Sequence, residues 1–424
     1  MTPEVLFHEL LGLGENWKVE KIEFLKDSKG EVHIVVESQP ELFENLRCEE
    51  CSAVMSLYDH APERTWRHLN IFEHVCYLHC KLPRCKCNKC GKMRRIEGPW
   101  QGKTKGFTLM FEAMCLTLLR EMPVNAVARI TGEHDTRLWR LLNSYVERSY
   151  EQKDFSEVEV IGCDELSAKK GPEYVSVFAD MKAKEVIFAT PGKSSDVFNE
   201  FSEELSKHGA NAKQIREISV DMSPAYTKGI RDNFSNTQIV YDRFHVFANI
   251  SKAVDEVRQR EHRKLIKQGD KTLKNTMWLF RKNPENLSAD QSVLLDDLTQ
   301  TNLMTAKAHQ MRLTLQDIYN YAPAVLFKRK ILAWCKWIDL CVREYGYIFE
   351  PMKKAAKTLR KYLDGIVAYK NNRTNNAFME GLNSVFSAVK RKARGFRNTQ
   401  NLITMLYFVS GNLPLDDLEL THRK

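Results

Sequence analysis

Apolar and polar residues follow two different periods along this chain, and the changes of period divide it into parts. Residues 17–38 fit a β-hairpin, because two segments alternate every second residue around the turn KDSKG. A second β-like stretch begins at His74. After Gly102 the pattern becomes helical, with apolar residues at helical spacing from Phe107 to Leu119. The first part is therefore predicted to be mainly strands and the next part helices.

Two further helices joined by a glycine turn are predicted after this helix. Pro123 opens the first, and the second begins near His134 or Asp135 and buries Leu138, Leu141 and Leu142. A short helix, a turn with glycine and a second amphipathic helix form a helix-turn-helix pattern, although an ordinary helical hairpin has the same pattern. If the second helix enters a DNA major groove, the residues able to reach it are His134, Thr136, Arg137 and Arg140.

From Val158 the period returns to two. VEVIGCDE, EYVSVFADM and KEVIFATPG predict three consecutive strands, followed by a helix over 197–208. The strand EISVD, a helix from Pro224, the strand QIVYDRF and a helix from His245 come next. The order β-β-β-α-β-α-β is that of a ribonuclease H-like fold. Residues 256–365 carry no strand signal and predict an all-helical insertion, and an apolar helix after Arg397 is expected to pack back on the core.

Seven of the eleven cysteines lie between residues 48 and 90. The N-terminal segment has acidic residues where a signal peptide needs basic ones, so a reducing compartment is expected, where clustered cysteines indicate metal ligation. CEEC and CKCNKC, separated by strands, are the sequence form of a zinc ribbon, since four thiolates complete the tetrahedral shell of one Zn²⁺. The predicted ligands are Cys48, Cys51, Cys87 and Cys90. Cys85 is an alternative to Cys87, and Cys76 and Cys80 are expected to face the interior.

Three carboxylates fall where the expected fold would bring them together. Asp164 is expected to end the first strand, Asp221 to end the neighbouring fourth strand, and Glu380 lies on the helix that returns after the insertion. Carboxylates suit Mg²⁺ or Mn²⁺, and two such ions about 4 Å apart assist displacement at phosphorus. A strand-end Asp is more often a cap or turn residue. The acids that compete for the same roles are Glu165, Asp180, Asp196 and Asp242.

Composition and charge narrow the class of protein. With 43% hydrophobic and 28% charged residues, wholesale disorder is excluded, and no apolar run approaches the ~20 residues of a membrane helix. The net charge of +9 weakly favours a polyanionic partner. Residues 361–398 carry eight basic residues against two acids. Five of the eight, which fit either a solvated helix face or contacts to DNA phosphates, are Lys390, Arg391, Lys392, Arg394 and Arg397.

On these residues the chain resembles transposases of the ISL-three family of bacterial insertion sequences, which join a zinc-binding N-terminus, a helix-turn-helix and a DDE catalytic domain. The sharpest match is MEGLNSVFSAVKRKARGFRN, which is similar to the family segment with the catalytic Glu. IGCDELSAKKG and SVDMSPAY resemble the segments with the two catalytic Asp residues, and VYDRFHV and LFRKNPENLS resemble two further family segments. One departure is Asn375-Asn376-Ala377, where the family often has Ser-Asn-Gly.

The resemblance implies the triad Asp164, Asp221 and Glu380 and the four zinc ligands already named. It implies a DDE transposase that binds the terminal inverted repeats of its insertion sequence, and that hydrolyses phosphodiesters and transfers strands with two Mg²⁺ or Mn²⁺ ions. A homo-oligomer on DNA is expected, because two element ends must be held at once. The expected location is the bacterial cytoplasm, at the nucleoid, without membrane contact. The alternatives are a non-catalytic sequence-specific DNA-binding regulator derived from a transposase, and a ribonuclease H-like nuclease.

The expected fold is therefore multidomain, with both α+β and α/β parts. Residues 1–100 would form the N-terminal hairpin and zinc-ribbon-like module, and residues 101–152 the helix-turn-helix. The ribonuclease H-like (DDE) catalytic domain would take residues 153–255 and 366–424, separated by the all-helical insertion at 256–365.

Overall fold

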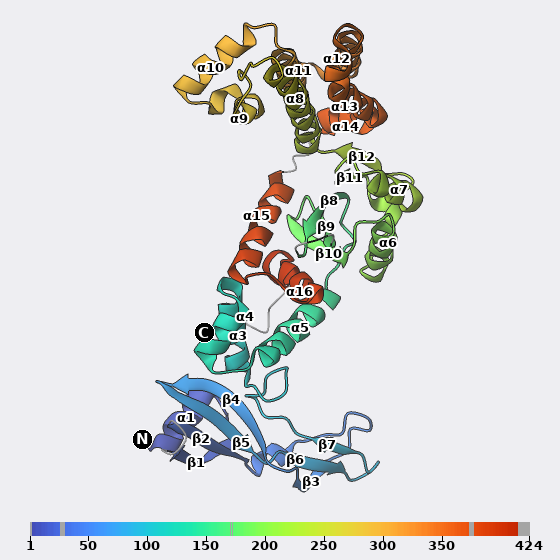
Figure 1. The fold of residues 1–424 in the computed structure, drawn as a ribbon. Helices are drawn as coiled ribbons and strands as arrows, with labels where there is room; N and C mark the ends of the chain where they lie inside the picture. Colours follow the sequence, from blue (N-terminus) through green and yellow to red (C-terminus); the bar gives the residue numbers. More distant parts are fainter. Residues whose placement is uncertain (1, 26–29, 170, 172, 373–376, 414–424) are drawn as a thin grey trace. The chain divides into compact units, whose positions relative to one another are not determined.

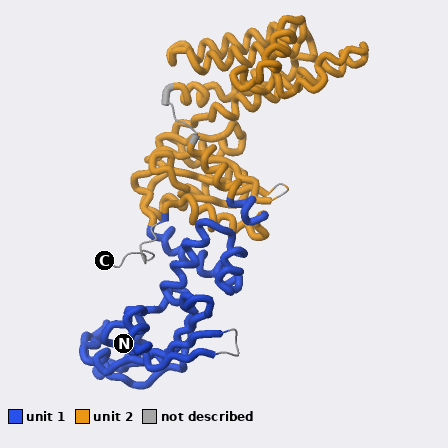
Figure 2. Tube along the Cα trace, turned by 90° about the vertical axis from the view of Figure 1, so that its left-hand side faces the viewer, with its two compact units in different colours: residues 1–152, 389–394, 413–424 blue, residues 153–388, 395–412 orange. Residues whose placement is uncertain are grey.

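The chain forms two compact units. The computed structural model describes residues 2–25, 30–169, 171, 173–372 and 377–413. The first unit is built mainly from residues 1–152 and takes in residues 389–394, and the second is built from residues 153–388 and 395–412 (Figure 2). The long helix α15 (Ala377–Lys392) contributes to both units.

A four-stranded sheet opens the first unit, with strand order β1-β2-β5-β4. The predicted hairpin is confirmed, since β1 (Trp17–Leu25) pairs antiparallel with β2 (Glu31–Ser38). β2 then pairs in parallel with β5 (His74–Cys80), which pairs antiparallel with β4 (Arg64–Ile71). Alternate residues of β2 and β5 enter one hydrophobic core, and Cys76 and Cys80 are among them, as predicted.

The helix α1 (Pro3–Leu11) precedes this sheet and packs against β1. Its start is set by Thr2, whose hydroxyl caps the first turn, and by Pro3 at the first helical position. Gly12 ends it with a left-handed backbone (φ 59°), the conformation that glycine adopts without a steric penalty. Neither α1 nor β4 was predicted from the sequence pattern.

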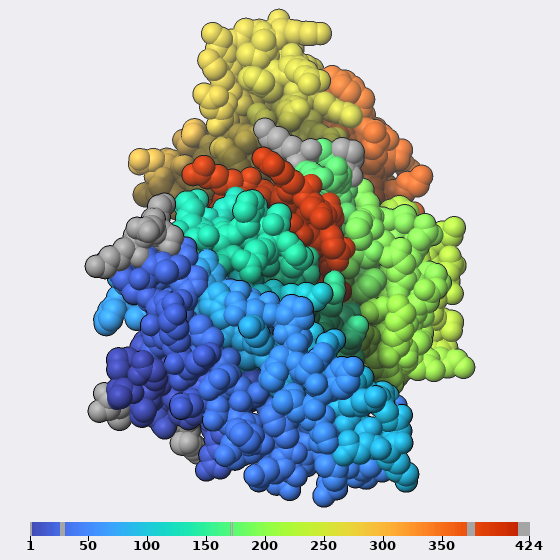
Figure 3. All heavy atoms as spheres, turned by 90° about the horizontal axis from the view of Figure 1, so that it is seen from below, coloured from blue at the N-terminus to red at the C-terminus, as the bar shows by residue number. Residues whose placement is uncertain are grey.

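A second, smaller sheet of the first unit has the order β3-β6-β7. It consists of β3 (Met55–His60), β6 (Pro83–Cys87) and β7 (Met93–Arg95), all antiparallel, and the single-turn helix α2 (Glu41–Glu44) precedes it. Figure 3 draws one face of the molecule, on which the described residues of both sheets of this unit appear in blue shades. The two CxxC segments flank β3 and β6, so this sheet sets their separation.

The helical part of the first unit has the predicted helix-turn-helix. Its helices are α3 (Leu109–Glu121), α4 (Val124–Thr131) and α5 (Asp135–Glu151). Pro123 caps α4, and Gly132 turns the chain with a left-handed backbone (φ 74°). The three leucines predicted to be buried on α5 are each 0% exposed.

The second unit is centred on a five-stranded sheet with the order β10-β9-β8-β11-β12. Its strands are β8 (Val160–Ser167), β9 (Tyr174–Asp180), β10 (Glu185–Pro191), β11 (Glu217–Val220) and β12 (Gln238–Tyr241). The first three strands are antiparallel neighbours, and β11 and β12 run parallel to β8. Together with α6 (Val197–Lys207) and α7 (Pro224–Asn233), this confirms the predicted ribonuclease H-like order.

Helices cover this sheet (Figure 1). On one side, Phe178 of β9 packs against Phe198 and Phe201 of α6, with ring centroids 5.3 and 4.3 Å away. The apolar helix α16 (Thr399–Ser410) packs on β10, and the Tyr407 hydroxyl accepts a hydrogen bond from the Ala189 amide at 2.9 Å. The predicted return of this helix to the core is confirmed.

An all-helical segment separates β12 from α15, as predicted. It contains α8 (Arg243–Ile266), α9 (Met277–Arg281), α10 (Ala289–Thr299), α11 (Met304–Tyr321), α12 (Ala324–Tyr345), α13 (Glu350–Lys361) and α14 (Leu363–Asn372). The chain returns to the sheet at α14, where Gly365 approaches Tyr241 so closely that a Cβ would lie 2.4 Å from the ring. In the part of the chain that the structure describes, no helix is long and apolar enough to cross a membrane.

Candidate functional site

The central strand β8 carries the first candidate carboxylate. Because side chains alternate along a strand, Gly162 and Asp164 share one face of the sheet. Met379 of α15 covers that face, since a Cβ on Gly162 would lie 2.9 Å from its side chain. One Asp164 oxygen accepts a hydrogen bond from Asn383 Nδ2 at 2.6 Å, and the other accepts one from the Glu165 amide at 2.7 Å.

The expectation that Asp164 ends its strand is wrong. β8 continues to Ser167, and Asp164 lies opposite Val177 in the ladder with β9. The strand continues because its antiparallel pairing with β9 runs on to Ser167 and Tyr174, whereas the parallel pairing with β11 stops at Gly162. Asp164 therefore lies beyond the part of β8 that pairs with β11, where β8 pairs with β9 alone.

Asp221 follows β11 directly, as predicted. Its pKa is raised by burial and by the negative charges of Asp164 and Asp242, and His245 opposes that shift from 4.0 Å. Burial and the negative charges of Asp221 and Asp164 also raise the pKa of Glu165, although the Lys193 ammonium lies 3.6 Å away. The carboxylates at this edge of the sheet thus destabilise each other's charged forms. A bound cation would relieve that repulsion.

Glu380 lies in the first turn of α15, on the helix that returns after the insertion. Its neighbour Met379 is buried against β8, and Asn383, one turn later, donates to Asp164. Glu380 is exposed and lines a pocket together with Asp242. The start of α15 therefore lies on the face of the sheet that carries Asp164. The segment Asn375-Asn376 before it lies outside the described residues.

The spacing of these acids differs from that of a single compact metal site. Among the residues that the structure describes, only the four cysteines bring three or more potential metal-binding atoms within 4.8 Å of one another. Asp164, Asp221 and Glu380 do not form such a group among the described residues. Two ions about 4 Å apart do not require every ligand to touch the same ion. The donor set, with anionic oxygens and few neutralising cations, suits hard divalent ions.

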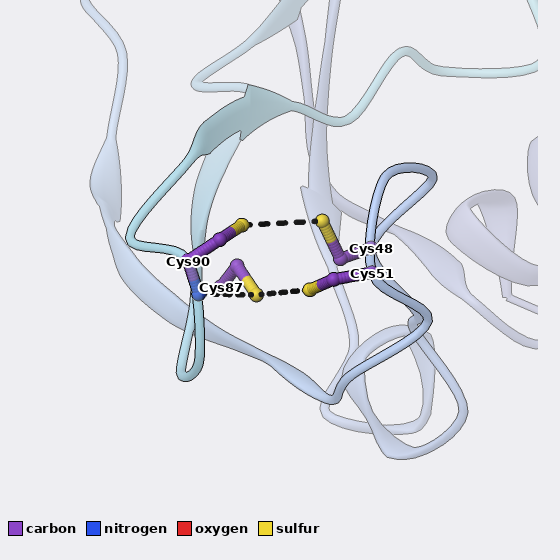
Figure 4. A group of neighbouring side chains, drawn as sticks. All are labelled: Cys48, Cys51, Cys87 and Cys90. Atoms are coloured by element: carbon purple, nitrogen blue, oxygen red, sulfur yellow. Dashed lines mark hydrogen bonds between the residues drawn. The ribbon is translucent and has the colours of Figure 1, made fainter.

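Cys48, Cys51, Cys87 and Cys90 point toward one another from the two CxxC segments (Figure 4). The Sγ atoms of Cys48 and Cys90 are 3.7 Å apart, and those of Cys51 and Cys87 are 3.4 Å apart. Four thiolates at about 2.3 Å from one tetrahedral Zn²⁺ would be separated by roughly 3.8 Å, so the group fits zinc. These separations are also too long for disulfides.

The local backbone prepares the second CxxC segment for a metal. The Sγ of Cys87 accepts hydrogen bonds from the amides of Lys89 and Cys90, both at 3.4 Å. These bonds lower the pKa of Cys87 to about 6, which favours the thiolate that binds metal. Cys85, the alternative ligand, is not in this group: it is fully buried in the hydrophobic core of the first unit.

The predicted DNA-reading residues of α5 differ in their surroundings. His134, Thr136 and Arg140 are exposed. The Arg137 guanidinium instead pairs with Glu133, donates to the Gly106 carbonyl at 3.2 Å and lies 4.2 Å from the Phe107 ring. Its contacts within the unit suit a role in positioning the start of α5.

A buried arginine of β4 completes this network, and the sequence pattern did not indicate it. Arg67 is 2% exposed, and its Nε lies 3.6 Å from a Glu133 oxygen. It also donates to the Thr131 carbonyl at 3.3 Å and stacks 4.7 Å from the Phe111 ring. Burial lowers the pKa of Arg67, with Glu133 opposing. Arg67 of the four-stranded sheet thus contacts the helical part through an ion pair, a hydrogen bond and an aromatic ring.

The basic segment continues α15 beyond Glu380. Lys390, the first residue of the basic segment, lies ten residues after Glu380. That spacing corresponds to about 15 Å along the axis of α15. Arg391, Arg394 and Arg397 are exposed. Lys392 is exposed as well, and its Nζ donates to the Glu121 carbonyl at 3.1 Å.

Comparison with known protein families identifies the family to which these parts belong. A model described as a transposase, of the ISL3 (ISL-three) family, matches residues 161–406, which is more than half of the chain. The chain belongs to the ISL3 family of transposases. The helix-turn-helix domain of transposase family ISL3 matches residues 99–146 of this transposase, and the zinc-finger of transposase IS204/IS1001/IS1096/IS1165 matches residues 44–90.

Relatives match this ISL3 transposase over nearly its whole length. It is 29% identical over 397 residues to the transposase for insertion sequence element IS1001 of Bordetella parapertussis, covering 92% of this chain and 95% of the relative. It is 24% identical over 442 residues to the transposase for insertion sequence element IS1557 of Mycobacterium tuberculosis, with 96% of both chains covered. The zinc-finger match and the four-cysteine group support a structural zinc in this transposase.

Proposed function

We propose that this ISL3 transposase binds the terminal inverted repeats of its insertion sequence, cleaves a phosphodiester at each end and joins the freed 3′ end to target DNA. The observation that carries the proposal is the contact between Asn383 and Asp164, since it brings the helix of Glu380 to the strand of Asp164. Asp164, Asp221 and Glu380 would hold two Mg²⁺ or Mn²⁺ ions. Bound there, the ions would supply Lewis-acid stabilisation of the charge that develops on phosphate oxygens.

The experiment that tests this function is strand transfer of a labelled element end into supercoiled DNA. The expected result is cleavage and joining that require Mg²⁺ or Mn²⁺. Binding of the ends without cleavage would indicate the non-catalytic regulator, and cleavage without joining would indicate a nuclease.

The remaining assignments belong to the same proposal. We assign residues 1–100 to the zinc module, 101–152 to the helix-turn-helix, 153–255 and 366–424 to the catalytic domain and 256–365 to the insertion. Two element ends must be held at once, so the active species would be a homo-oligomer on DNA. Because the proposed substrate is DNA, we expect the protein at the nucleoid, in the bacterial cytoplasm.

Arg140 is expected to read the inverted repeat. The Arg140→Gln variant should bind the cognate repeat roughly 5- to 150-fold more weakly, because a bidentate arginine contact to a base contributes about 1–3 kcal/mol. Binding to unrelated DNA should change much less, and fluorescence anisotropy on both duplexes measures the difference. The control is Arg129→Gln, which removes an exposed arginine from α4. Equal losses on both duplexes with Arg140→Gln would contradict base reading.

The basic segment is expected to contact phosphates without reading sequence. Replacing Arg391 and Arg397 together by Gln should weaken binding to all duplexes alike, and should reduce the slope of log affinity against log salt by about 1.8. The control replaces Lys184 and Lys213, two exposed lysines of the second unit, and should leave the slope nearly unchanged. A loss confined to one sequence would argue against phosphate contact.

A further inference from the structure

A pocket of about 310 Å³ lies within the second unit, and Glu380, one of the three proposed catalytic acids, is part of its wall. Asp242 and Glu380 form part of its wall, and Arg243, Phe244, Asn283 and Arg312 form another part. These residues come from four segments: the start of α8, the loop after α9, the helix α11 and the start of α15. The volume is at the lower end of the range for small-molecule sites. The chemistry of its wall indicates what it binds.

Arg312 is a buried cation: burial lowers its pKa, and Glu285, which lies beyond ion-pair distance, opposes that shift. Its side chain is 3% exposed, and among the described residues no carboxylate lies within ion-pair distance of it. Nη1 donates to the Asn283 side chain at 3.1 Å and Nη2 to the Lys282 carbonyl at 2.9 Å, while the buried Nε has no partner among those residues. A buried charge left unpaired is strongly unfavourable, so an anion that enters the pocket would be stabilised there. The planar guanidinium fork matches a phosphate.

Asn283 and Lys282 explain the segment RKNPEN, which the proposed function leaves without a role. Asn283 precedes a short 3-10 turn over Pro284–Asn286, and its side chain makes no cap bond to that turn. Its amide oxygen is used instead to hold Arg312. The segment therefore fixes the orientation of the guanidinium at the pocket wall.

The segment DRFH supplies three residues of the wall, Asp242, Arg243 and Phe244. Asp242 caps α8 by accepting a hydrogen bond from the Phe244 amide at 3.0 Å, which places Arg243 and Phe244 in the first turn. Arg243 donates to Asn320 Oδ1 at 2.7 Å and, among the described residues, has no carboxylate within ion-pair distance. Phe244 also lines the pocket and is 59% exposed, so its ring is available for stacking.

We propose that this pocket holds one nucleotide of the DNA strand next to the scissile bond, with its phosphate on Arg312 and Arg243 and its base, taken out of the stack, on Phe244. The inference rests on the proposed function, because it places that nucleotide beside Glu380. Every base has a face that can stack on an aromatic ring, so this contact needs no particular sequence. The amide of Asn283 and the two cations are the polar groups of the wall that suit a phosphate, while Asp242 and Glu380 supply its acidic groups.

The base contact is tested with 2-aminopurine, a base whose fluorescence rises when it leaves the stack. It is placed in turn at each position near the cleavage point of an element-end duplex, and binding is measured with Ca²⁺ in place of Mg²⁺ to prevent cleavage. The wild-type protein should raise the fluorescence at one position, and Phe244→Ala should lose that rise. The control is Tyr347→Ala, which removes an exposed aromatic residue elsewhere in the helical insertion and should keep the rise.

Cleavage provides a second measurement of the base contact. Phe244→Ala should cut paired ends about ten- to a hundredfold more slowly, which is the range expected for the stacking of one base. With an abasic site at the same position, wild type and Phe244→Ala should cut at equal rates. An equal loss on paired and abasic ends would overturn the proposal. If the wild-type protein cuts the ends while no position becomes fluorescent, this inference fails and the proposed function stands; if it neither binds nor cuts them, the proposed function fails.

The phosphate contact is tested through stability as well as activity. Arg312→Gln removes the unpaired charge but keeps a donor for Asn283, so the melting temperature without DNA should not fall, while cleavage should fall at least tenfold. Arg312→Lys, which keeps the charge and loses the fork, should recover only part of the activity. A lower melting temperature with unchanged cleavage would assign Arg312 to the fold and overturn the proposal. If Arg312→Gln loses cleavage while Phe244→Ala cuts like wild type, the pocket binds a phosphate without a base. That result would overturn the proposal that it holds a nucleotide.

Discussion

The Glu380→Gln variant is expected to lose cleavage of the element ends by at least ~10³-fold, while its binding to the inverted repeat stays within about twofold of wild type. The amide keeps the shape of the side chain and removes the negative charge that a divalent ion needs. A factor of 10³ corresponds to about 4 kcal/mol of transition-state stabilisation, which one metal contact can supply. Cleavage of a labelled end and anisotropy on the same duplex measure the two effects separately.

The same result is expected for Asp164→Asn and Asp221→Asn, the other two acids of the proposed triad. The matched control is Asp196→Asn, a change at one of the competing acids, whose side chain accepts hydrogen bonds from Ser194 and Ser195 beside α6. It should cut the ends at a normal rate. Normal strand transfer by any one triad variant would remove that residue from the proposed site, and a loss with Asp196→Asn would show that the assay responds to charge in general.

The fold of the second unit followed from the sequence because its strands are short segments rich in apolar residues, separated by turns or by helical stretches. The order from β8 to β12 could therefore be read along the chain, and so could the long interval without strands. The position of Asp164 within β8 could not be read, since the end of a strand depends on how far its partner continues. The strand β4 was missed for a related reason: Trp66, Arg67 and His68 are all buried, so the sequence does not alternate.

The surroundings of charged residues were the least predictable part. Arginine is usually a surface residue, so the sequence gives no reason to expect Arg312 and Arg67 in the interior. Tertiary packing buries them, at 3% and 2% exposure. Arg137 has helical spacing that suits a DNA contact, yet a cation–aromatic contact and an acid four residues before it hold its guanidinium. The role of Asn383 was not predicted, although the residue lies in a segment that resembles the family. A single amide on a helix does not indicate a contact until its partner on β8 is known.

The Cys87→Ser variant is expected to lose its zinc and, with it, the small sheet β3-β6-β7. A structural Zn²⁺ in zinc-finger peptides contributes an apparent binding free energy of about 10–16 kcal/mol, more than the whole stability of most domains. The serine hydroxyl does not ionise at neutral pH and cannot replace the thiolate. The metal content measured by atomic absorption should fall from one zinc per chain to nearly none, and amide exchange in residues 55–60 and 83–95 should become fast.

Cys85 provides the matched control, because it lies two residues away on the same strand and is fully buried. Cys85→Ala removes one sulfur from the hydrophobic core, so it should lower the free energy of unfolding by only about 1 kcal/mol and retain one zinc per chain. If Cys87→Ser retains zinc and Cys85→Ala loses it, Cys85 is the zinc ligand and Cys87 is not. Zinc lost by Cys87→Ser without loss of protection in the small sheet would mean that its strands hold together without the metal. In that case the binding of DNA ends should also survive, because the sheet that sets the separation of the two CxxC segments would remain folded.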